Sequence, residues 1–134
     1  MQKFNSWGVS FSTIRFFEEG LESHNKIKSI SRDSDILFTI DTVFNATYKV
    51  LLLNEYVMGE ASVIKALGEF GKLDFIVYGG KWNDSTEEAN RIASENNIRL
   101  FDISDFLGAI NLKNPKEYNP NAKKKSSITS CKHA

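Results

Sequence analysis

The 134-residue sequence contains very little cysteine and histidine: one cysteine, Cys131, and two histidines, His24 and His133. A single thiol excludes a disulfide within the chain and any zinc site built from several cysteines. The two histidines stand far apart in the sequence and give no support to a histidine metal site. A lone cysteine is typical of proteins in a reducing compartment, so we expect an intracellular, cytoplasmic protein.

Long apolar runs and the common short catalytic motifs are lacking as well. No run of apolar residues approaches the roughly 20 that a membrane-spanning helix requires, so we expect no association with a membrane. The first residues, MQKFNSWG, lack a basic region followed by an apolar core, so we expect no secretory signal. The sequence has no GxxxxGK(S/T) phosphate loop and no motif for Ser–His–Asp or Cys–His catalysis.

Positive and negative charges cancel over the whole chain but are unevenly distributed. Residues 1–112 carry 11 Lys and Arg against 16 Asp and Glu, a net of −5, whereas residues 113–134 carry 6 against 1, a net of +5. We therefore predict one domain over residues 1–111 and a basic, disordered tail over residues 112–134. The tail would be either a solvated terminus or a phosphate-binding arm.

The region from Tyr48 to Gly80 has the pattern of a strand, a helix and a second strand. Its two apolar runs, Val50–Leu53 and Phe75–Tyr78, are short and continuous, as in strands that are buried on both faces. Between them, apolar residues recur at helical spacing: Ala61, Ile64, Ala66, Leu67 and Phe70. The region therefore predicts a βαβ unit with a parallel strand pair and a helix over Ala61–Phe70.

The rest of the sequence predicts helices and strands on both sides of this unit. Helices are expected over residues 10–24, from a cap at Asp84 or Ser85 to Asn96, and over 104–110, and strands over 26–31, 35–42, 48–56 and 98–101. The apolar side of the first helix comprises Phe11, Ile14, Phe17 and Leu21, and Gly20 is expected to weaken its end. The order α-β-β-β-α-β-α-β-α predicts an α/β fold with a mixed β-sheet flanked by helices.

Two acidic residues mark ends of neighbouring predicted strands. Asp35 begins the second strand and Glu55 lies at the end of the third. A hairpin through residues 44–47 would pair residues whose numbers sum to about 91, which sets Asp35 opposite Tyr56, next to Glu55. Two neighbouring carboxylates can hold a hard divalent cation such as Mg²⁺. In the alternative reading, each acid only marks a strand end, solvated or paired with a nearby base.

Several phrases of the sequence resemble the restriction-endonuclease-like superfamily with the PD-(D/E)xK active site, and within it the Mrr-type nucleases. The phrase FFEEGLESHNKIKSI resembles the family's first helix and strand, and SDILF resembles its aspartate-bearing strand. KVLLLNEYVMGEASVIKAL resembles the strand with the (D/E/Q)xK signature and the helix that follows it. DFIVYGGKWNDSTEEANRIASENNIRLFDISDFLGAI resembles the final half of the domain, and the likeness covers about residues 10–111.

The resemblance implies a Mg²⁺-dependent DNA endonuclease in which Asp35 and Glu55 bind the metal and take part in catalysis. The family's lysine follows its Glu or Gln by two residues, but this position holds Val57, which has neither a donor nor a charge. Lys65 on the following helix is the candidate replacement. Lys49 is the less suitable candidate, because it would lie about 20 Å from Glu55 along a strand.

Three functions are therefore weighed. The first is a metal-dependent nuclease that acts on DNA, and the absence of the lysine at Val57 implies weak or no cleavage. The second is a catalytically inactive nuclease fold that binds nucleic acid or a protein partner. The third is an α/β domain of unrelated function whose acids are structural. The net negative charge of residues 1–112 disfavours tight nonspecific DNA binding, which depends on neutralising phosphates.

Overall fold

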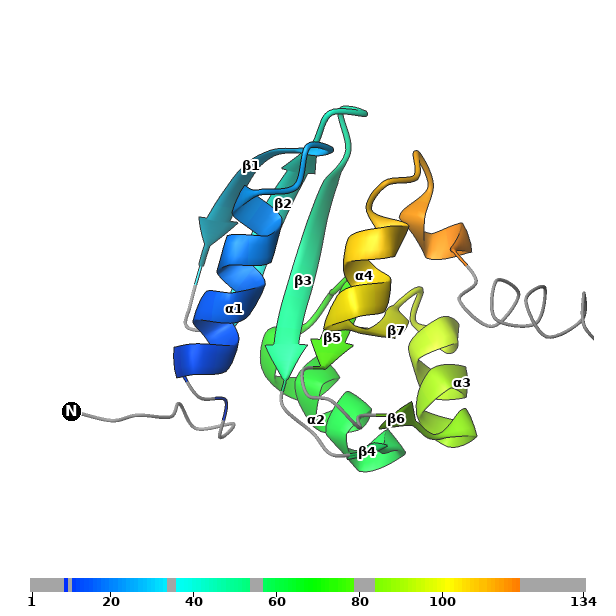
Figure 1. The fold of residues 1–134 in the computed structure, drawn as a ribbon. Helices are drawn as coiled ribbons and strands as arrows, with labels where there is room; N and C mark the ends of the chain where they lie inside the picture. Colours follow the sequence, from blue (N-terminus) through cyan, green and yellow to red (C-terminus); the bar gives the residue numbers. More distant parts are fainter. Residues whose placement is uncertain (1–8, 10, 34–35, 54–56, 79–83, 119–134) are drawn as a thin grey trace, which may run out of the picture.

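The computed structural model describes residues 9, 11–33, 36–53, 57–78 and 84–118. A five-stranded sheet lies between two helical layers, with α1 and α4 on one face and α2 and α3 on the other (Figure 1). The helices are α1 (Phe11–Glu22), α2 (Glu60–Phe70), α3 (Glu87–Glu95), α4 (Ile103–Ala109) and the 3₁₀ helix η1 (Pro115–Glu117). The strands are β1 (Ile27–Arg32), β2 (Leu37–Thr42), β3 (Thr47–Leu53), β4 (Val57–Met58), β5 (Phe75–Tyr78), β6 (Asp84–Ser85) and β7 (Arg99–Asp102).

The main sheet combines an antiparallel half with a parallel half. Its order is β1-β2-β3-β5-β7, in which β1, β2 and β3 form an antiparallel meander and β3, β5 and β7 run parallel. The predicted α/β class, the mixed sheet and the βαβ unit formed by β3, α2 and β5 are confirmed. The sequence did not predict β4 and β6, which pair with each other as a second, two-stranded parallel sheet. Within the described ranges, no helix is long and apolar enough to cross a membrane.

An aromatic cluster fills the core between the sheet and the layer of α1 and α4. Phe75 on β5 is fully buried, and its ring centroid lies 5.2 Å from that of Phe106 on α4 and 5.3 Å from that of Tyr48 on β3. Phe17 on α1 is also fully buried and packs against Phe38 and Phe106. These contacts join the two helices to both halves of the sheet.

The register of β2 and β3 differs from the prediction. Leu37 pairs with Leu51, and every pair in the ladder sums to 88 rather than 91. The reason is the position of the turn, which has its centre at Phe44 rather than between Asn45 and Ala46. The Thr42 hydroxyl accepts hydrogen bonds from the backbone N–H groups of Phe44 and Ala46, and Asn45 adopts a positive φ of 64°. Asparagine tolerates this left-handed conformation better than most residues.

Two predicted helix faces were partly wrong. In α1, Ile14, Phe17 and Leu21 are buried as predicted, but Phe11 is 45% exposed at the first position of the helix. In α2, Val63 and Ala66 face the sheet, whereas Ile64 is 53% exposed. Because successive helical residues are rotated by about 100°, burial of Val63 turns Ile64 toward solvent.

The predicted cap of α3 needs correction, and Gly20 has a packing role that the sequence did not indicate. Asp84 and Ser85 belong to β6, and the side chain of Thr86 caps α3 by accepting a hydrogen bond from Ala89 N. Gly20 lies inside α1, where an added Cβ would sit 3.1 Å from Leu107 Cδ1 of α4. Glycine at this position therefore allows the two helices to approach closely.

The folded part continues to Tyr118, beyond the predicted domain end at residue 111. Lys116 Nζ lies 3.2 Å from Asp74 Oδ1, and the ring centroid of Tyr118 is 5.9 Å from that of Phe101. The lysine-rich composition of the tail predicted that its side chains would be solvated. Lys116 is instead paired with an acid that is remote in sequence. Residues 119–134 of the predicted tail lie outside the described residues.

Candidate functional site

The carboxyl ends of the parallel strands define one edge of the sheet. The last residues of β3, β5 and β7 are Leu53, Tyr78 and Asp102, and the ladders place them side by side. The first residue of β2 lies at this same edge, because β2 runs antiparallel to β3; the adjacent Ile36 accepts a hydrogen bond from Leu52 N. Open α/β sheets commonly bind ligands at the carboxyl ends of their strands. We call this edge of the molecule the carboxyl edge.

The two predicted metal ligands, Asp35 and Glu55, lie outside the described residues. Their chain neighbours are described: Ile36 directly follows Asp35, and Leu53 precedes Glu55 by two residues. Both neighbours are at the carboxyl edge. Because the two acids themselves lie outside the described residues, the distance between their carboxylates stays a prediction. Among the residues that the structure does describe, no three His, Cys, Asp or Glu side chains are grouped so that they could hold a metal ion.

Two parallel ladders bracket the segment that contains Glu55. The ladder of β3 and β5 ends with the pair Leu53 and Tyr78, and the ladder of β4 and β6 begins with the pair Val57 and Asp84. The described residues on both sides of segments 54–56 and 79–83 are therefore paired: the ends of β3 and β5 before them, and the starts of β4 and β6 after them. The backbone of Val57, at the position of the family's lysine, is fixed by this second ladder.

The two candidate lysines lie in different parts of the fold. Lys49 is on β3, where its Nζ lies 3.1 Å from Asp33 Oδ2 and its backbone N–H donates to Asp74, just before β5. It is therefore near the amino end of the parallel strands, away from the carboxyl edge, as the sequence spacing indicated. Lys65 is in α2 on the exposed side of the helix, next to the buried Ala66.

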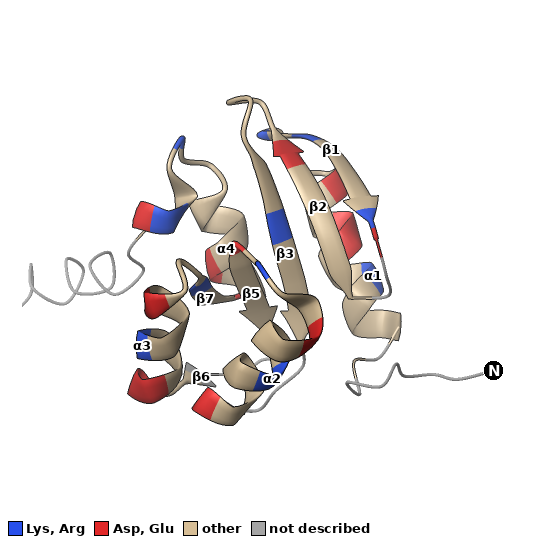
Figure 2. Ribbon diagram, turned by 180° about the vertical axis from the view of Figure 1, so that it is seen from behind, with Lys and Arg blue, Asp and Glu red and all other residues tan. Residues whose placement is uncertain are grey.

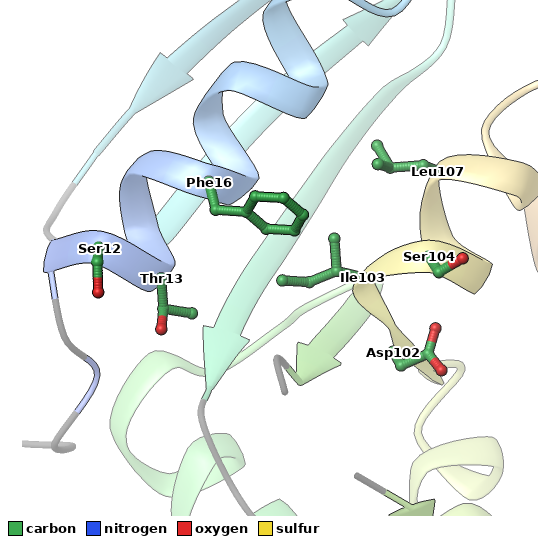
Figure 3. A pocket seen from close by; sticks show the side chains of 7 residues that line it. All are labelled: Ser12, Thr13, Phe16, Asp102, Ile103, Ser104 and Leu107. Atoms are coloured by element: carbon green, nitrogen blue, oxygen red, sulfur yellow. The ribbon is translucent and has the colours of Figure 1, made fainter. Parts of the chain in front are cut away.

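A cavity of about 680 Å³ opens at the carboxyl edge between α1 and α4 (Figure 3). Its lining combines one aromatic, two aliphatic, three hydroxyl and one acidic side chain: Phe16, Ile103, Leu107, Ser12, Thr13, Ser104 and Asp102. Asp102 ends β7 and caps α4, since its Oδ1 accepts a hydrogen bond of 2.7 Å from Asp105 N.

Sequence reasoning did not single out Asp102. The signal was present, because Asp102 is an acid at the end of a short apolar strand, like Glu55. Phe16 had no comparable signal, since an aromatic residue in an amphipathic helix is more often part of the core.

A second group of acids lies on the face of the meander that is turned away from α1. Thr39 donates a hydrogen bond of 2.6 Å to Asp33, and Thr47 donates one of 2.6 Å to Asp41. Figure 2 looks onto this face, beside the layer of α2 and α3. The bond from Thr39, followed by that from Lys49, lowers the pKa of Asp33. The bonds from Thr47 and then Ser29 lower the pKa of Asp41.

These lowered pKa values predict a loss of stability in acid. A carboxyl group whose pKa is lower in the folded state stabilises the fold above its unfolded pKa of about 3.9, and this contribution is lost as the pH falls through the folded pKa. We expect Asp41→Asn to destabilise the protein at pH 6, and we expect this effect to shrink between pH 6 and about pH 2 as Asp41 becomes protonated in the folded protein. Thermal unfolding across this range measures the difference.

Thr47→Val removes the strongest hydrogen-bond donor, so the pKa of Asp41, followed by NMR, should rise; an unchanged pKa would contradict this assignment.

Comparison with known proteins adds no family assignment to this geometry. The chain matches no protein-family model, and the search of proteins with curated functions also finds no match.

Proposed function

We propose that this chain is a restriction-endonuclease-like domain of the Mrr type that binds DNA at its carboxyl edge with the help of a divalent cation. Asp35 and Glu55 would hold the cation, and cleavage of the phosphodiester is weak or lost because Val57 replaces the lysine. We keep one alternative, which is a catalytically inactive domain that binds nucleic acid or a protein partner.

The arrangement of the sheet is the observation that carries this proposal. The resemblance implies an initial helix, an aspartate-bearing strand beside the signature strand, and a parallel strand reached through a helix. The order α1, β1, β2, β3, α2, β5 agrees with it, and the described neighbours of Asp35 and Glu55, Ile36 and Leu53, both lie at the carboxyl edge. This arrangement supports the family reading without assigning a function.

The donor set suits a hard divalent cation. Two carboxylates supply the oxygen ligands that Mg²⁺ prefers, and phosphate oxygens and water can complete its coordination. When bound, such a cation neutralises charge on a phosphodiester and lowers the pKa of coordinated water. With a net charge of −5 over residues 1–112, the domain itself repels DNA, so we expect binding to depend on the cation.

Val57 is the specific reason to keep the inactive domain as the second candidate. In the resembling family, a lysine at this position orients water and stabilises charge on the phosphate. Valine supplies neither effect, and Lys65 is the remaining candidate on the adjoining helix. A domain that keeps the two acids but lacks the lysine would still bind a cation and a phosphate.

Fluorescence anisotropy with a labelled DNA duplex tests the proposal. We expect binding with Ca²⁺ or Mg²⁺ to be at least about tenfold tighter than with EDTA, and Asp35→Asn or Glu55→Gln to abolish this difference. Asp41→Asn, which changes an acid at the opposite end of β2, is the matched control and should retain the difference. DNA binding that is equally tight with and without the cation, and that is unchanged when either acid is replaced, would reject the proposal.

The cleavage assay on the same duplex separates the two candidates. Feeble Mg²⁺-dependent cleavage that disappears in Lys65→Ala supports an active site with a relocated lysine. Cation-dependent binding without any cleavage supports the inactive binding domain. Robust cleavage unaffected by Lys65→Ala contradicts the assignment of catalytic residues.

A further inference from the structure

The cavity between α1 and α4 presents an aromatic ring that the core does not use. Phe16 is 63% exposed, whereas Phe17, the next residue of α1, is fully buried against Phe38 and Phe106. In Figure 3 the ring of Phe16 projects from α1 into the space between the helices, toward Ile103 and Leu107 of α4. An exposed ring facing an aliphatic wall leaves room for a flat, apolar group between them.

The polar part of the cavity contains three hydroxyl groups and one carboxylate, that of Asp102. Asp102 uses Oδ1 to cap α4, and its Oδ2 has no hydrogen-bond partner among the described residues. Figure 3 shows the side chains of Asp102 and Ser104 at the start of α4. A carboxylate only accepts hydrogen bonds, so the complementary ligand must present a hydrogen-bond donor, such as an N–H group, at the edge of its flat part.

The volume and the position of the cavity narrow the choice of ligand further. A volume of about 680 Å³ lies within the range of about 300–1,000 Å³ that is usual for small-molecule sites. The cavity includes the end of β7 and therefore shares the carboxyl edge with the described neighbours of Asp35 and Glu55. A strand of nucleic acid held at that edge would have its bases within reach of this cavity.

We propose that this cavity binds an unpaired nucleobase that carries an exocyclic amino group. Phe16 stacks on the face of the base, and Asp102 accepts a hydrogen bond from its amino group. Aromatic stacking is tolerant of base identity. The carboxylate favours adenine, cytosine or guanine, which carry the amino group, over thymine and uracil, whose one N–H donor lies between two carbonyl oxygens that repel a carboxylate. The inference rests on the proposed action on nucleic acid, and it assigns base preference to residues outside the metal site.

Titration of the whole protein with nucleosides tests the cavity without phosphate. With amide NMR signals as the readout, cytidine and adenosine should shift signals of α1 and α4 and bind about tenfold more tightly than thymidine. Phe16→Ala should weaken binding of cytidine about tenfold, the effect of losing one stacking partner. Phe11→Ala is the matched control, because Phe11 is an exposed phenylalanine of the same helix that does not line the cavity.

Asp102→Asn provides a second, independent test. Asparagine caps helices about as well as aspartate, so α4 should remain intact. Its amide group adds a donor, and the preference should therefore move from cytidine toward thymidine. Equal binding of all three nucleosides, shifts outside α1 and α4, or full binding by Phe16→Ala would overturn the proposal. Tighter binding of butylammonium than of cytidine at the same signals would make the cavity a site for organic cations and would also overturn it.

The outcome can be separated from that of the proposed function. Asp35→Asn and Glu55→Gln should leave nucleoside binding unchanged, whereas they should abolish cation-dependent binding of duplex DNA. Nucleoside binding without cation-dependent DNA binding would support the cavity and reject the metal site. The reverse result would reject the cavity alone.

Discussion

Replacing Phe75 by alanine is expected to lower the free energy of unfolding by about 3–5 kcal/mol. Phe75 is fully buried at the start of β5, and its ring centroid lies within 6.0 Å of those of Tyr48, Phe101 and Phe106. Alanine would leave a cavity that three neighbouring rings cannot fill without losing their own contacts. Because a domain is stable by only about 5–15 kcal/mol, much of the fold's stability would be lost. Urea denaturation followed by circular dichroism measures the change.

The matched control is Phe11→Ala. Phe11 is 45% exposed at the start of α1, and its truncation should change the free energy of unfolding by less than about 1 kcal/mol. Equal effects of the two substitutions would contradict the assignment of Phe75 to the centre of the core.

Introducing the missing lysine is the second large effect that we expect. Val57→Lys restores the spacing of the family signature after Glu55 on a backbone segment that the pairing of β4 with β6 already fixes. A single preorganised electrostatic group typically contributes about 10²–10³ in rate, so we expect Mg²⁺-dependent cleavage of duplex DNA to rise by this factor. Supercoiled plasmid is a sensitive substrate for the assay.

The specificity of this effect depends on two controls. Val57→Met has similar length without charge and should leave cleavage at the level of the natural chain. Val57→Lys combined with Asp35→Asn should lose the gain, because the lysine acts on a phosphate that the cation helps to hold. A gain that persists without Asp35 would point to a contaminating nuclease or to other catalytic residues and would contradict the proposed site.

The parts of the fold that depend on local pattern were predicted well from the sequence. Strand β5 begins and ends at the predicted residues, Phe75 and Tyr78, because a strand buried on both faces is a continuous apolar run. Strand β3 contains the predicted run Val50–Leu53 for the same reason, and all four of these residues are buried. Two such runs on either side of a helical pattern leave few alternatives to a parallel pair.

The parts that depend on particular turns or on distant residues were not predictable in the same way. The register of β2 and β3 is set by hydrogen bonds to the Thr42 hydroxyl and by the positive φ of Asn45, which hydrophobic pattern does not encode. The salt bridge between Lys116 and Asp74 joins residues that are remote in sequence. It extends the folded part into a segment whose composition alone indicated a disordered tail.

From the sequence, only the position of the candidate site in the fold could be predicted. The acid-at-strand-end pattern of Glu55 and Asp35 predicts a site at the carboxyl edge, where the described residues nearest to them in the chain, Leu53 and Ile36, lie; the placement of the two acids stays a prediction. The cavity requires the approach of α1 to α4, which Gly20 permits through its contact with Leu107. Contacts between helices that are distant in sequence are decided by the packed fold, so Phe16 and Asp102 could not be brought together from sequence alone.

Titration with Mn²⁺, followed by paramagnetic broadening of amide NMR signals, tests the proposed metal site most directly. Broadening falls steeply with distance from the ion, so the affected amides locate it. We expect broadening centred on Ile36, Leu53 and Val57 at the carboxyl edge, and its loss in Asp35→Ala. Broadening centred on Asp41 at the far end of β2, no broadening at the carboxyl edge, or an unchanged pattern in Asp35→Ala would contradict the account.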